Sequence, residues 1–115
     1  MKVYSGQRTS DRHVVTVDGK PLDPRDDLLA AASGSFEWGY EGAGPGQLAL
    51  AILADFYQND QQALAKYRQF LRAYVAEIEA DHWTLVGSRI SEMLDGYVDV
   101  PMTLAELMAK VRGGP

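Results

Sequence analysis

A wholly apolar stretch, Leu48 to Ala54, follows directly on a turn rich in glycine and proline. A helix over these residues is apolar on every side, and such a helix must be covered by other elements on several sides. Pro45 suits the first turn of that helix, where the N–H that proline lacks would have no partner. We therefore expect a central, buried helix from Pro45 to about Gln58, with the rest of the chain packed around it.

A second helix follows after a short turn. Asn59 or Asp60 is placed to cap its start, and the apolar pattern predicts that it runs to about Ala80. Its apolar residues recur at helical spacing: Leu64, Tyr67, Leu71, Tyr74, Val75 and Ile78. Two helices joined by so short a turn are expected to form an antiparallel hairpin.

The first part of the chain predicts strands. Lys2 to Arg8 and the β-branched run His13 to Val17 are expected to pair as a hairpin, and Asp18-Gly19 is a turn signal that ends the second strand. Trp83 to Val86 is a further candidate strand. Phe36 to Trp38 is expected either as a short strand or as an extended segment packed on the hairpin.

Shorter elements complete the expected fold. Arg25 to Ala32 predicts one or two helical turns, and Ser88 is placed to cap a short helix through Leu94. A capping-box pattern opens a last helix, Thr103 to about Arg112. Together these elements predict a single domain over residues 1–115. Its class is α+β: a small, mainly antiparallel sheet packed on a helical hairpin, with short C-terminal helices.

Composition narrows the chemistry and the compartment. The 115 residues include no cysteine, which excludes disulfides, thiolate zinc sites and thiol catalysis. No apolar core of a signal peptide follows the first residues, and the longest apolar run is too short to span a bilayer. We expect a soluble, cytoplasmic protein that needs no cofactor and does not associate with membranes.

Charge is arranged in blocks within a net charge of −5. Residues 26–65 carry six acidic and no basic residues, whereas residues 66–76 contribute Lys66, Arg68 and Arg72. The acidic block argues against binding duplex nucleic acid, which needs clustered Lys and Arg. It fits either a solvated surface or a face that engages a basic protein. Arg68 and Arg72 share one helix face and form a small basic patch unless neighbouring acids neutralise it.

The glycine-rich turn has two interpretations. Gly42, Gly44 and Gly46 stand at a helix start, whose N–H groups and dipole attract phosphates or carboxylates. However, the turn lacks the lysine of a P-loop, Pro45 removes one donor, and Glu41 repels an anion. The alternative is that the glycines allow unusual backbone angles and close packing against aromatic neighbours.

Trp38, Tyr40 and Gln47 flank this turn. Tyr and Trp anchor many protein interfaces and are equally ordinary core residues; we expect Trp38 in the core and Tyr40 as an exposed anchor. The Gln47 amide either binds turn carbonyls or faces a ligand. The predicted binding residues are Trp38, Tyr40, Glu41, Gly42, Gly44 and Gln47, with no metal ligand and no catalytic residue.

Signals for catalysis are weak. Asp81 and His82 are neighbouring candidates for acid–base chemistry, but no nucleophile accompanies them in a recognised motif. No pair of histidines has the helical spacing of a zinc site, and Asp23, Asp26 and Asp27 lack the spacing of a calcium loop. We expect a protein that is not an enzyme, with chemistry at Asp81 and His82 as the enzymatic alternative.

A set of short motifs runs through most of the chain. They are Tyr4-x-Gly6-x-Arg8, Val17-Asp18-Gly19-x-x-Leu22, Phe36-x-Trp38-Gly39-Tyr40-x-Gly42-x-Gly44-Pro45-x-Gln47-Leu48-Ala49-Leu50-Ala51, Tyr67-x-x-Phe70 and Trp83-x-Leu85. On these motifs the chain resembles a small bacterial family of unknown function, whose members also occur on phages and plasmids. The likeness covers about residues 2–94, and residues 96–112 look like an addition. The family usually has serine at the position of Ala43 and lysine at that of Leu71. The resemblance implies a shared fold and brings no catalytic residues.

Two functional hypotheses follow. The first is a non-enzymatic protein-interaction module of bacterial or phage origin, whose acidic surface and turn at residues 40–47 engage a partner protein. An acidic inhibitor of the anti-CRISPR type is one concrete form of it. The alternative is a sensor that binds a nucleotide or another anion at the turn before the central helix. Apolar residues of the C-terminal extension have two interpretations, a contact in a homodimer or a cap on the protein's own core: Val100, Met102, Leu104, Leu107 and Met108.

Overall fold

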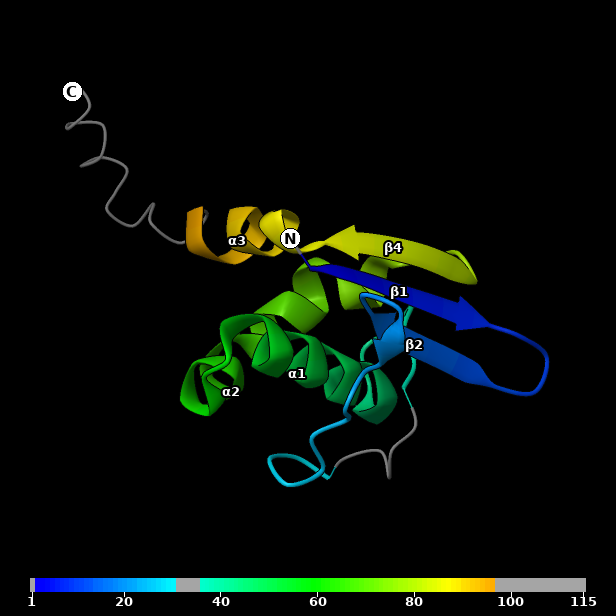
Figure 1. The fold of residues 1–115 in the computed structure, drawn as a ribbon, viewed down its shortest axis with the longest axis horizontal. Coiled ribbons are helices and arrows are strands. Elements are labelled where there is room, and N and C mark those ends of the chain that lie inside the picture. The colour runs from blue at the N-terminus through cyan, green and yellow to red at the C-terminus, as the bar shows by residue number, and fades with distance from the viewer. Residues whose placement is uncertain (1, 31–35, 97–115) are drawn as a thin grey trace.

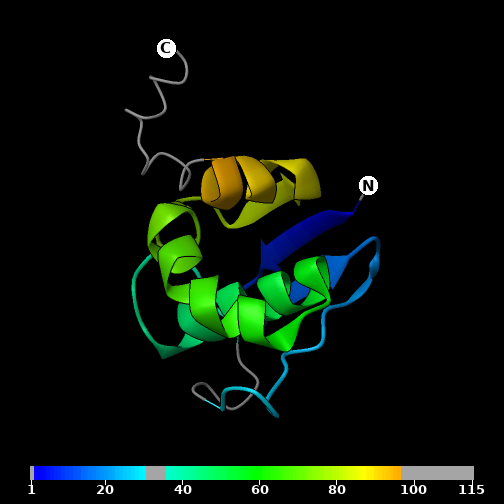
Figure 2. The same cartoon turned by 90° about the vertical axis from the view of Figure 1, so that its left-hand side faces the viewer.

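The computed structural model describes residues 2–30 and 36–96. In chain order the elements are β1 (Val3–Arg8), β2 (His13–Val17), β3 (Lys20–Pro21), α1 (Ala43–Tyr57), α2 (Asp60–Ala73), the 3-10 turn η1 (Val75–Glu77), β4 (His82–Val86), α3 (Gly87–Ser91) and the π-helical turn η2 (Glu92–Gly96). The strands form one antiparallel sheet in the order β3-β2-β1-β4. Helices α1 and α2 lie side by side on one side of this sheet (Figure 1, Figure 2). The predicted α+β fold, an antiparallel sheet packed on a helical hairpin, is confirmed.

The first hairpin forms where the sequence predicts it. Asp18 and Gly19 have positive φ angles of 51° and 83°, which match the twist of a two-residue hairpin turn. This turn does more than end β2, because it leads into β3, a strand of two residues that the sequence did not predict. Pro21 argues against a strand in the middle of a sheet, but β3 lies at the edge, where proline is tolerated.

Helix α1 is the central helix that the apolar stretch predicts. Every residue from Pro45 to Ala54 is buried, because the sheet covers one side of the helix and α2 another. The helix begins at Ala43, slightly before the expected Pro45, and Gly42 is its N-cap. It ends at Tyr57, and Gln58 closes it in the left-handed conformation.

Helix α2 is shorter than predicted. Asn59 caps it as expected, since its side chain accepts the N–H of Gln62 at 3.0 Å. The helix ends at Ala73 instead of about Ala80, and the chain continues as η1. A tertiary contact explains the change: the carbonyl of Val75, itself fully buried, accepts the N–H of Gly39 at 3.0 Å. This carbonyl is therefore shared between a distant segment and the local 3-10 turn, because the N–H of Ile78 also donates to it at 3.4 Å.

The segment around Trp38 is extended but joins no strand, so the second of its two predicted forms is the correct one. The indole of Trp38 is buried as expected and donates to the carbonyl of Ala80 at 2.9 Å. Its ring meets the rings of His13 and Trp83 edge to face, at centroid distances of 5.5 and 5.6 Å. Trp83 in turn covers Gly6, whose missing side chain leaves the room that the indole occupies.

The short helix α3 starts directly after β4. The N–H of Gly87 donates to the carbonyl of Lys2 at 2.8 Å, so the β1–β4 ladder continues up to the first helical residue. Ser88 is thus already inside the helix, and its predicted role as the cap is wrong: Val86 is the N-cap, with no side-chain bond.

Some expectations concern other parts of the chain. The described part of the segment for which helical turns were predicted, residues 25–30, forms a single turn over residues 26–28, in which the N–H of Leu28 donates to the carbonyl of Arg25. The predicted last helix from Thr103 and residues 100–108, the candidates for a dimer contact or a core cap, lie outside the described residues. Within residues 2–30 and 36–96, no helix is both long and apolar enough to cross a membrane.

Candidate functional site

A groove lies where the start of α1 meets the second half of α2. Its volume is about 490 Å³. Because the two helices are antiparallel neighbours, the glycine-rich turn and the basic patch, far apart in sequence, share this groove. We call it the α1–α2 groove; its lining residues are Leu29, Glu41, Gly42, Ala43, Gly46, Tyr67, Arg68, Leu71 and Arg72.

Positive charge dominates the side chains at this groove. Arg68 and Arg72 are both exposed, and within the described chain Arg68 forms no ion pair; its guanidinium lies 5.3 Å from the ring centre of Tyr67. Arg72 Nε is 3.7 Å from Glu41 Oε1, a pair exposed on both sides and therefore weak. The expectation that neighbouring acids neutralise this patch is thus met only at Arg72.

The start of α1 adds to this positive character. The helix has no side-chain cap and no acidic residue in its first turn. Pro45 has no N–H, and the N–H of Gly46 donates to the carbonyl of Gly42 at 2.9 Å. Among the described residues the N–H groups of Ala43 and Gly44 have no acceptor, so they contribute partial positive charge beside Arg72.

The three glycines of the turn differ in how much space a side chain would have at each position. A Cβ on Gly44 would lie 2.8 Å from Cβ of Glu37, so the start of α1 packs directly on the extended segment before it. A Cβ on Gly42 would lie 2.7 Å from the ring of Tyr40, whereas one on Gly46 would make an ordinary contact of 3.9 Å with Tyr67. Close packing is therefore the role that the geometry gives to Gly44.

The six predicted binding residues separate into two groups. Tyr40, with half of its surface exposed, and the exposed Glu41 and Gly42 lie at or beside the α1–α2 groove. Trp38 and Gln47 are 1% and 0% exposed and lie in the core, and Gly44 is half-buried behind the turn.

The side chain of Gln47 binds the loop that contains Pro24 and Leu29. Its Nε2 donates to the carbonyls of Pro24 and Leu29, at 2.7 and 2.5 Å. The buried amide therefore fixes the loop that carries Leu29 to the edge of the groove. Of its two predicted roles, binding carbonyls is the one the structure shows.

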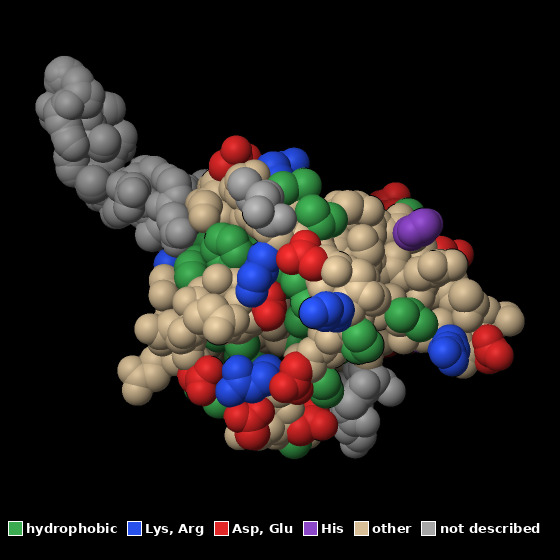
Figure 3. Space-filling model, viewed as in Figure 1, with side chains coloured by type: hydrophobic (Ala, Val, Ile, Leu, Met, Phe, Trp, Pro, Cys, Tyr) green, Lys and Arg blue, Asp and Glu red, His purple; other side chains and the backbone are tan. Residues whose placement is uncertain are grey.

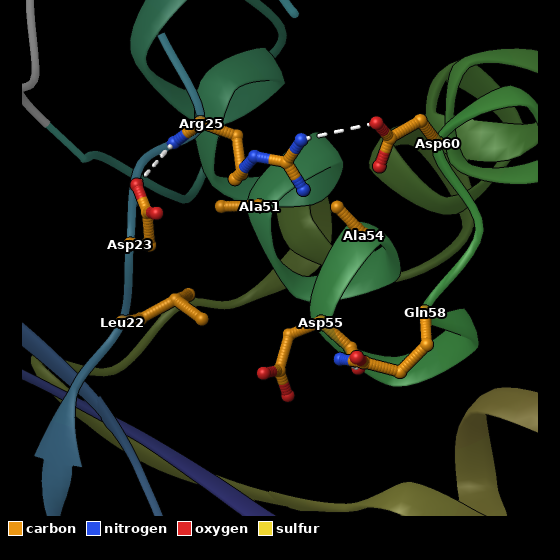
Figure 4. Close-up of a pocket in the computed structure, with 8 residues that line it drawn as sticks. All are labelled: Leu22, Asp23, Arg25, Ala51, Ala54, Asp55, Gln58 and Asp60. Carbon is orange, nitrogen blue, oxygen red and sulfur yellow. Dashed lines mark hydrogen bonds and ion pairs between the residues drawn. The ribbon is translucent and has the colours of Figure 1, made fainter. Parts of the chain in front are cut away.

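A second cavity, of about 260 Å³, lies at the other end of α1 (Figure 4). Arg25 reaches across it to Asp60 at 3.2 Å and also pairs with Asp27 at 2.9 Å, which lowers the pKa of the Asp27 carboxyl below its usual value. Asp55, on the same cavity wall, accepts from Lys2 Nζ at 3.0 Å and Tyr4 Oη at 2.7 Å. Among the described residues, no group of His, Asp and Glu is arranged to hold a metal ion.

These pairs change the interpretation of the acidic block. Figure 3 shows acidic and basic side chains gathered together at the lower middle of the molecule, where α1, α2 and residues 22–30 meet. The carboxylates of Asp27, Asp55 and Asp60 each have an internal cation, and Glu37 pairs with Arg8 at 3.4 Å. Much of the predicted acidic block is therefore paired with cations of the same fold.

Arg8 organises a polar cluster that sequence analysis missed. Its guanidinium donates to Asp81 at 3.0 Å, to Glu37 at 3.4 Å and to the carbonyl of Trp38 at 3.0 Å, while Nε donates to His13 Nε2 at 3.1 Å. The pairing of Arg8 with His13 across β1 and β2 follows from the hairpin register. The contacts with Glu37 and Asp81 join segments that are distant in sequence, so no local sequence pattern predicts them.

The predicted enzymatic pair is divided between two environments. Asp81 bonds to Arg8, and its carbonyl accepts the Arg8 N–H at 2.8 Å. His82 begins β4, is exposed, and lies on the face of the sheet opposite the helices.

Comparison with known proteins gives a family and no activity. A family described as a family of unknown function, DUF6166, matches residues 4–96. This chain belongs to the DUF6166 family. The match includes both helices of the α1–α2 groove and all four strands, except for Val3 at the start of β1. Its range is close to residues 2–94, over which the motifs predict the likeness. No curated protein and no solved structure matches this DUF6166 chain.

Proposed function

We propose that this DUF6166 protein is a non-enzymatic protein-interaction module whose α1–α2 groove receives an acidic segment of a partner protein. The observation that carries the proposal is the exposed pair Arg68 and Arg72 at the mouth of the groove, beside the uncapped start of α1. Arginine binds carboxylates through two parallel hydrogen bonds, and one of these two guanidiniums has no carboxylate partner in the described chain.

The shape of the groove favours a protein segment over a small molecule. Small-molecule sites enclose most of their ligand, whereas this groove has exposed side chains of Glu41, Arg68 and Arg72 along it. Tyr40 stands next to the groove with 51% of its surface exposed. Exposed Tyr and Arg side chains are the commonest energetic anchors of protein interfaces.

A basic partner, or an anti-CRISPR-like inhibitor role, would need carboxylates that the fold leaves free. Five of the six acidic residues of the block 26–65 form ion pairs within the described chain: Asp27, Glu37, Glu41, Asp55 and Asp60. Of the six, only Asp26 is left without one there, so we place the partner contact at the groove. The basic partner stays a prediction.

The proposed role is non-enzymatic because the candidate groups do not converge. The side chain of Asp81 bonds to Arg8, while His82 stands on the outer face of the sheet. A general acid or base must lie within hydrogen-bond reach of the groups with which it acts. An H82A variant that loses a detectable reaction would reverse this part of the proposal.

Selection from a display library of random peptides tests the proposal. Wild-type protein is expected to enrich peptides rich in Asp and Glu. The R68E/R72E variant should lose this enrichment, whereas R12E/K20E, which changes the net charge equally at exposed sites on β3 and the β1–β2 turn, should keep it. Enrichment of neutral or basic peptides, or equal loss in both variants, would contradict the proposal.

The anion sensor is the second candidate, because the same arginines suit phosphate. A ligand at about 100 times its Kd adds about 2.7 kcal/mol to the free energy of unfolding, a rise in Tm of roughly 10 °C for a domain of this size. A thermal-shift titration with inorganic phosphate and with nucleotides measures it. A large rise that R68E/R72E abolishes, together with no peptide enrichment, would replace the interaction module by the sensor.

A further inference from the structure

The face of the sheet turned away from the helices carries almost no charge. Alternation along the strands places Tyr4, Val15, Trp83 and Leu85 on the buried side. The residues of β1, β2 and β4 on the opposite side are Val3, Ser5, Gln7, Val14, Thr16, His82, Thr84 and Val86. None of these is Asp, Glu, Lys or Arg, in a chain of which 23% is charged. The cores of protein interfaces show the same depletion of charge.

Within residues 2–30 and 36–96, no strand pairs with the outer edge of β4, which lies beside this face. Two hydrogen bonds fix the register between β1 and β4. The N–H of Gly87 donates to the carbonyl of Lys2, and the N–H of Arg8 donates to the carbonyl of Asp81, both at 2.8 Å. In an antiparallel ladder the bonded residues alternate, so Trp83 and Leu85 bond to β1. The N–H and C=O groups of His82 and Thr84 and the N–H of Val86 therefore point away from β1, whereas the C=O of Val86, the N-cap of α3, faces the helix. Figure 1 shows β4 at the upper rim, with no element drawn beyond the strand itself.

The two edges of the sheet differ in their protection. Monomeric proteins guard edge strands with lysine, proline, a bulge or a short strand, because open edges pair with other chains. Strand β3 has three of these devices, since it consists of Lys20 and Pro21 alone. Strand β4 has five residues, pairs regularly with β1 and contains neither lysine nor proline.

We propose that β4 pairs with β4 of a second copy of this chain, antiparallel, to form one continuous sheet across a two-fold axis. With Thr84 opposite the partner's Thr84, the two threonines form a bonded pair on the axis. His82 then lies opposite the partner's Val86, and each Val86 N–H meets the carbonyl of the opposite His82. The edge is self-complementary, as a two-fold interface requires. Two copies that each carry a net charge of −5 repel elsewhere, but the facing side chains here are uncharged.

This interface is separate from the α1–α2 groove. The groove lies on the helical side of the sheet, whereas the paired edge and its uncharged face lie on the rim and the opposite side. A variant that cannot pair through β4 should therefore still bind an acidic peptide. Failure of either proposal leaves the other standing.

Sedimentation velocity across a concentration series tests the pairing. Wild-type protein is expected to shift from 12.6 kDa toward twice that mass as its concentration approaches about 1 mM, where even a millimolar Kd gives substantial complex. The T84K variant places two lysines face to face on the axis and should raise the dimer Kd at least about tenfold. The matched T16K variant adds the same charge to the same face, but on β2, away from the edge. Its dimer Kd should lie closer to that of wild type than the Kd of T84K does.

Amide hydrogen exchange identifies the contact. The amides of Thr84 and Val86 should exchange more slowly at high than at low protein concentration, and this difference should vanish in T84K. A wild-type protein that stays monomeric throughout the series would overturn the proposal. A dimer that T84K leaves intact, or one in which these amides exchange equally fast at both concentrations, would overturn it as well.

Discussion

The guanidinium carbon of Arg8 lies 4.7 Å from the ring centre of Trp38, and the same side chain donates to the carbonyl of Trp38 at 3.0 Å. One arginine on β1 thus binds both the ring and the backbone of a segment that follows thirty residues later. This contact holds the extended segment before the glycine-rich turn against the sheet. The start of α1, and with it the α1–α2 groove, is positioned on that segment.

Substitution of Arg8 by lysine tests this anchor. Lysine keeps the charge but lacks the planar fork that reaches Asp81, Glu37 and the Trp38 carbonyl together. We expect R8K to lower the free energy of unfolding by about 2 kcal/mol, measured by urea denaturation. R12K, at an exposed position of the β1–β2 turn, should change it by less than about 0.5 kcal/mol. Equal effects of the two substitutions would show that Arg8 is no anchor.

Alanine at Gly44 and at Gly46 should have opposite effects. At Gly44 the new Cβ meets Cβ of Glu37 at 2.8 Å, so the helix start must shift, at a cost of about 1–3 kcal/mol. At Gly46 the new Cβ makes an ordinary contact of 3.9 Å, and alanine in a helix stabilises by about 0.4–1 kcal/mol. Thermal unfolding of both variants measures the difference. Destabilisation of equal size at both positions would contradict the packing role of Gly44.

Loss of the Gln47 amide should weaken the loop at the groove. In Q47L the carbonyls of Pro24 and Leu29 lose a buried donor, and we expect a loss of about 2 kcal/mol in the free energy of unfolding. Q61L is the matched control, because Gln61 is exposed on α2. If Q47L unfolds at the same urea concentration as Q61L, the amide does not hold this loop.

Stability should fall at alkaline pH because of Tyr4 and Tyr74. Burial raises the pKa of both phenols above the ordinary value near 10, and for Tyr4 the bond to Asp55 raises it further. Since the folded pKa exceeds the unfolded one, the stabilisation is complete below about pH 10 and is lost as the pH rises above it. Urea denaturation between neutral pH and pH 11 measures this loss. Y4F removes one such group, so its stability should decline less steeply than that of wild type; parallel declines would refute the assignment.

Local patterns predicted most of the fold, because the type of each main element can be recognised from the spacing of apolar residues within a short stretch of sequence. The apolar run at Leu48 to Ala54 and the β-branched run at His13 to Val17 are of this kind. The early end of α2 was not predictable in this way, since it depends on a bond between Gly39 and Val75. Strand β3 was not predicted because it contains Pro21, and proline is tolerated in a sheet only at an edge. Which strand lies at the edge depends on the strand order, and local sequence does not determine that order.

The candidate site was predicted in pieces. The glycine-rich turn and the pair Arg68 and Arg72 were both identified, and an antiparallel helical hairpin brings the start of one helix beside the end of the other. The sequence did not show that the acidic block is largely paired inside the fold, because those pairs involve Lys2 and Arg25 from the strand region and its following loop. It also gave no sign that β4 lies at the edge of the sheet.

Titration of the isotope-labelled protein with a short glutamate-rich peptide, followed by NMR, tests the central claim most directly. We predict saturable shifts of the backbone amides of Ala43, Gly44 and Arg68, which weaken with added salt and disappear in R68E/R72E but persist in R12E/K20E. A lysine-rich peptide of equal length should leave these amides unchanged. Absence of shifts at saturating peptide, or shifts centred on Arg25 instead of the α1–α2 groove, would contradict the account.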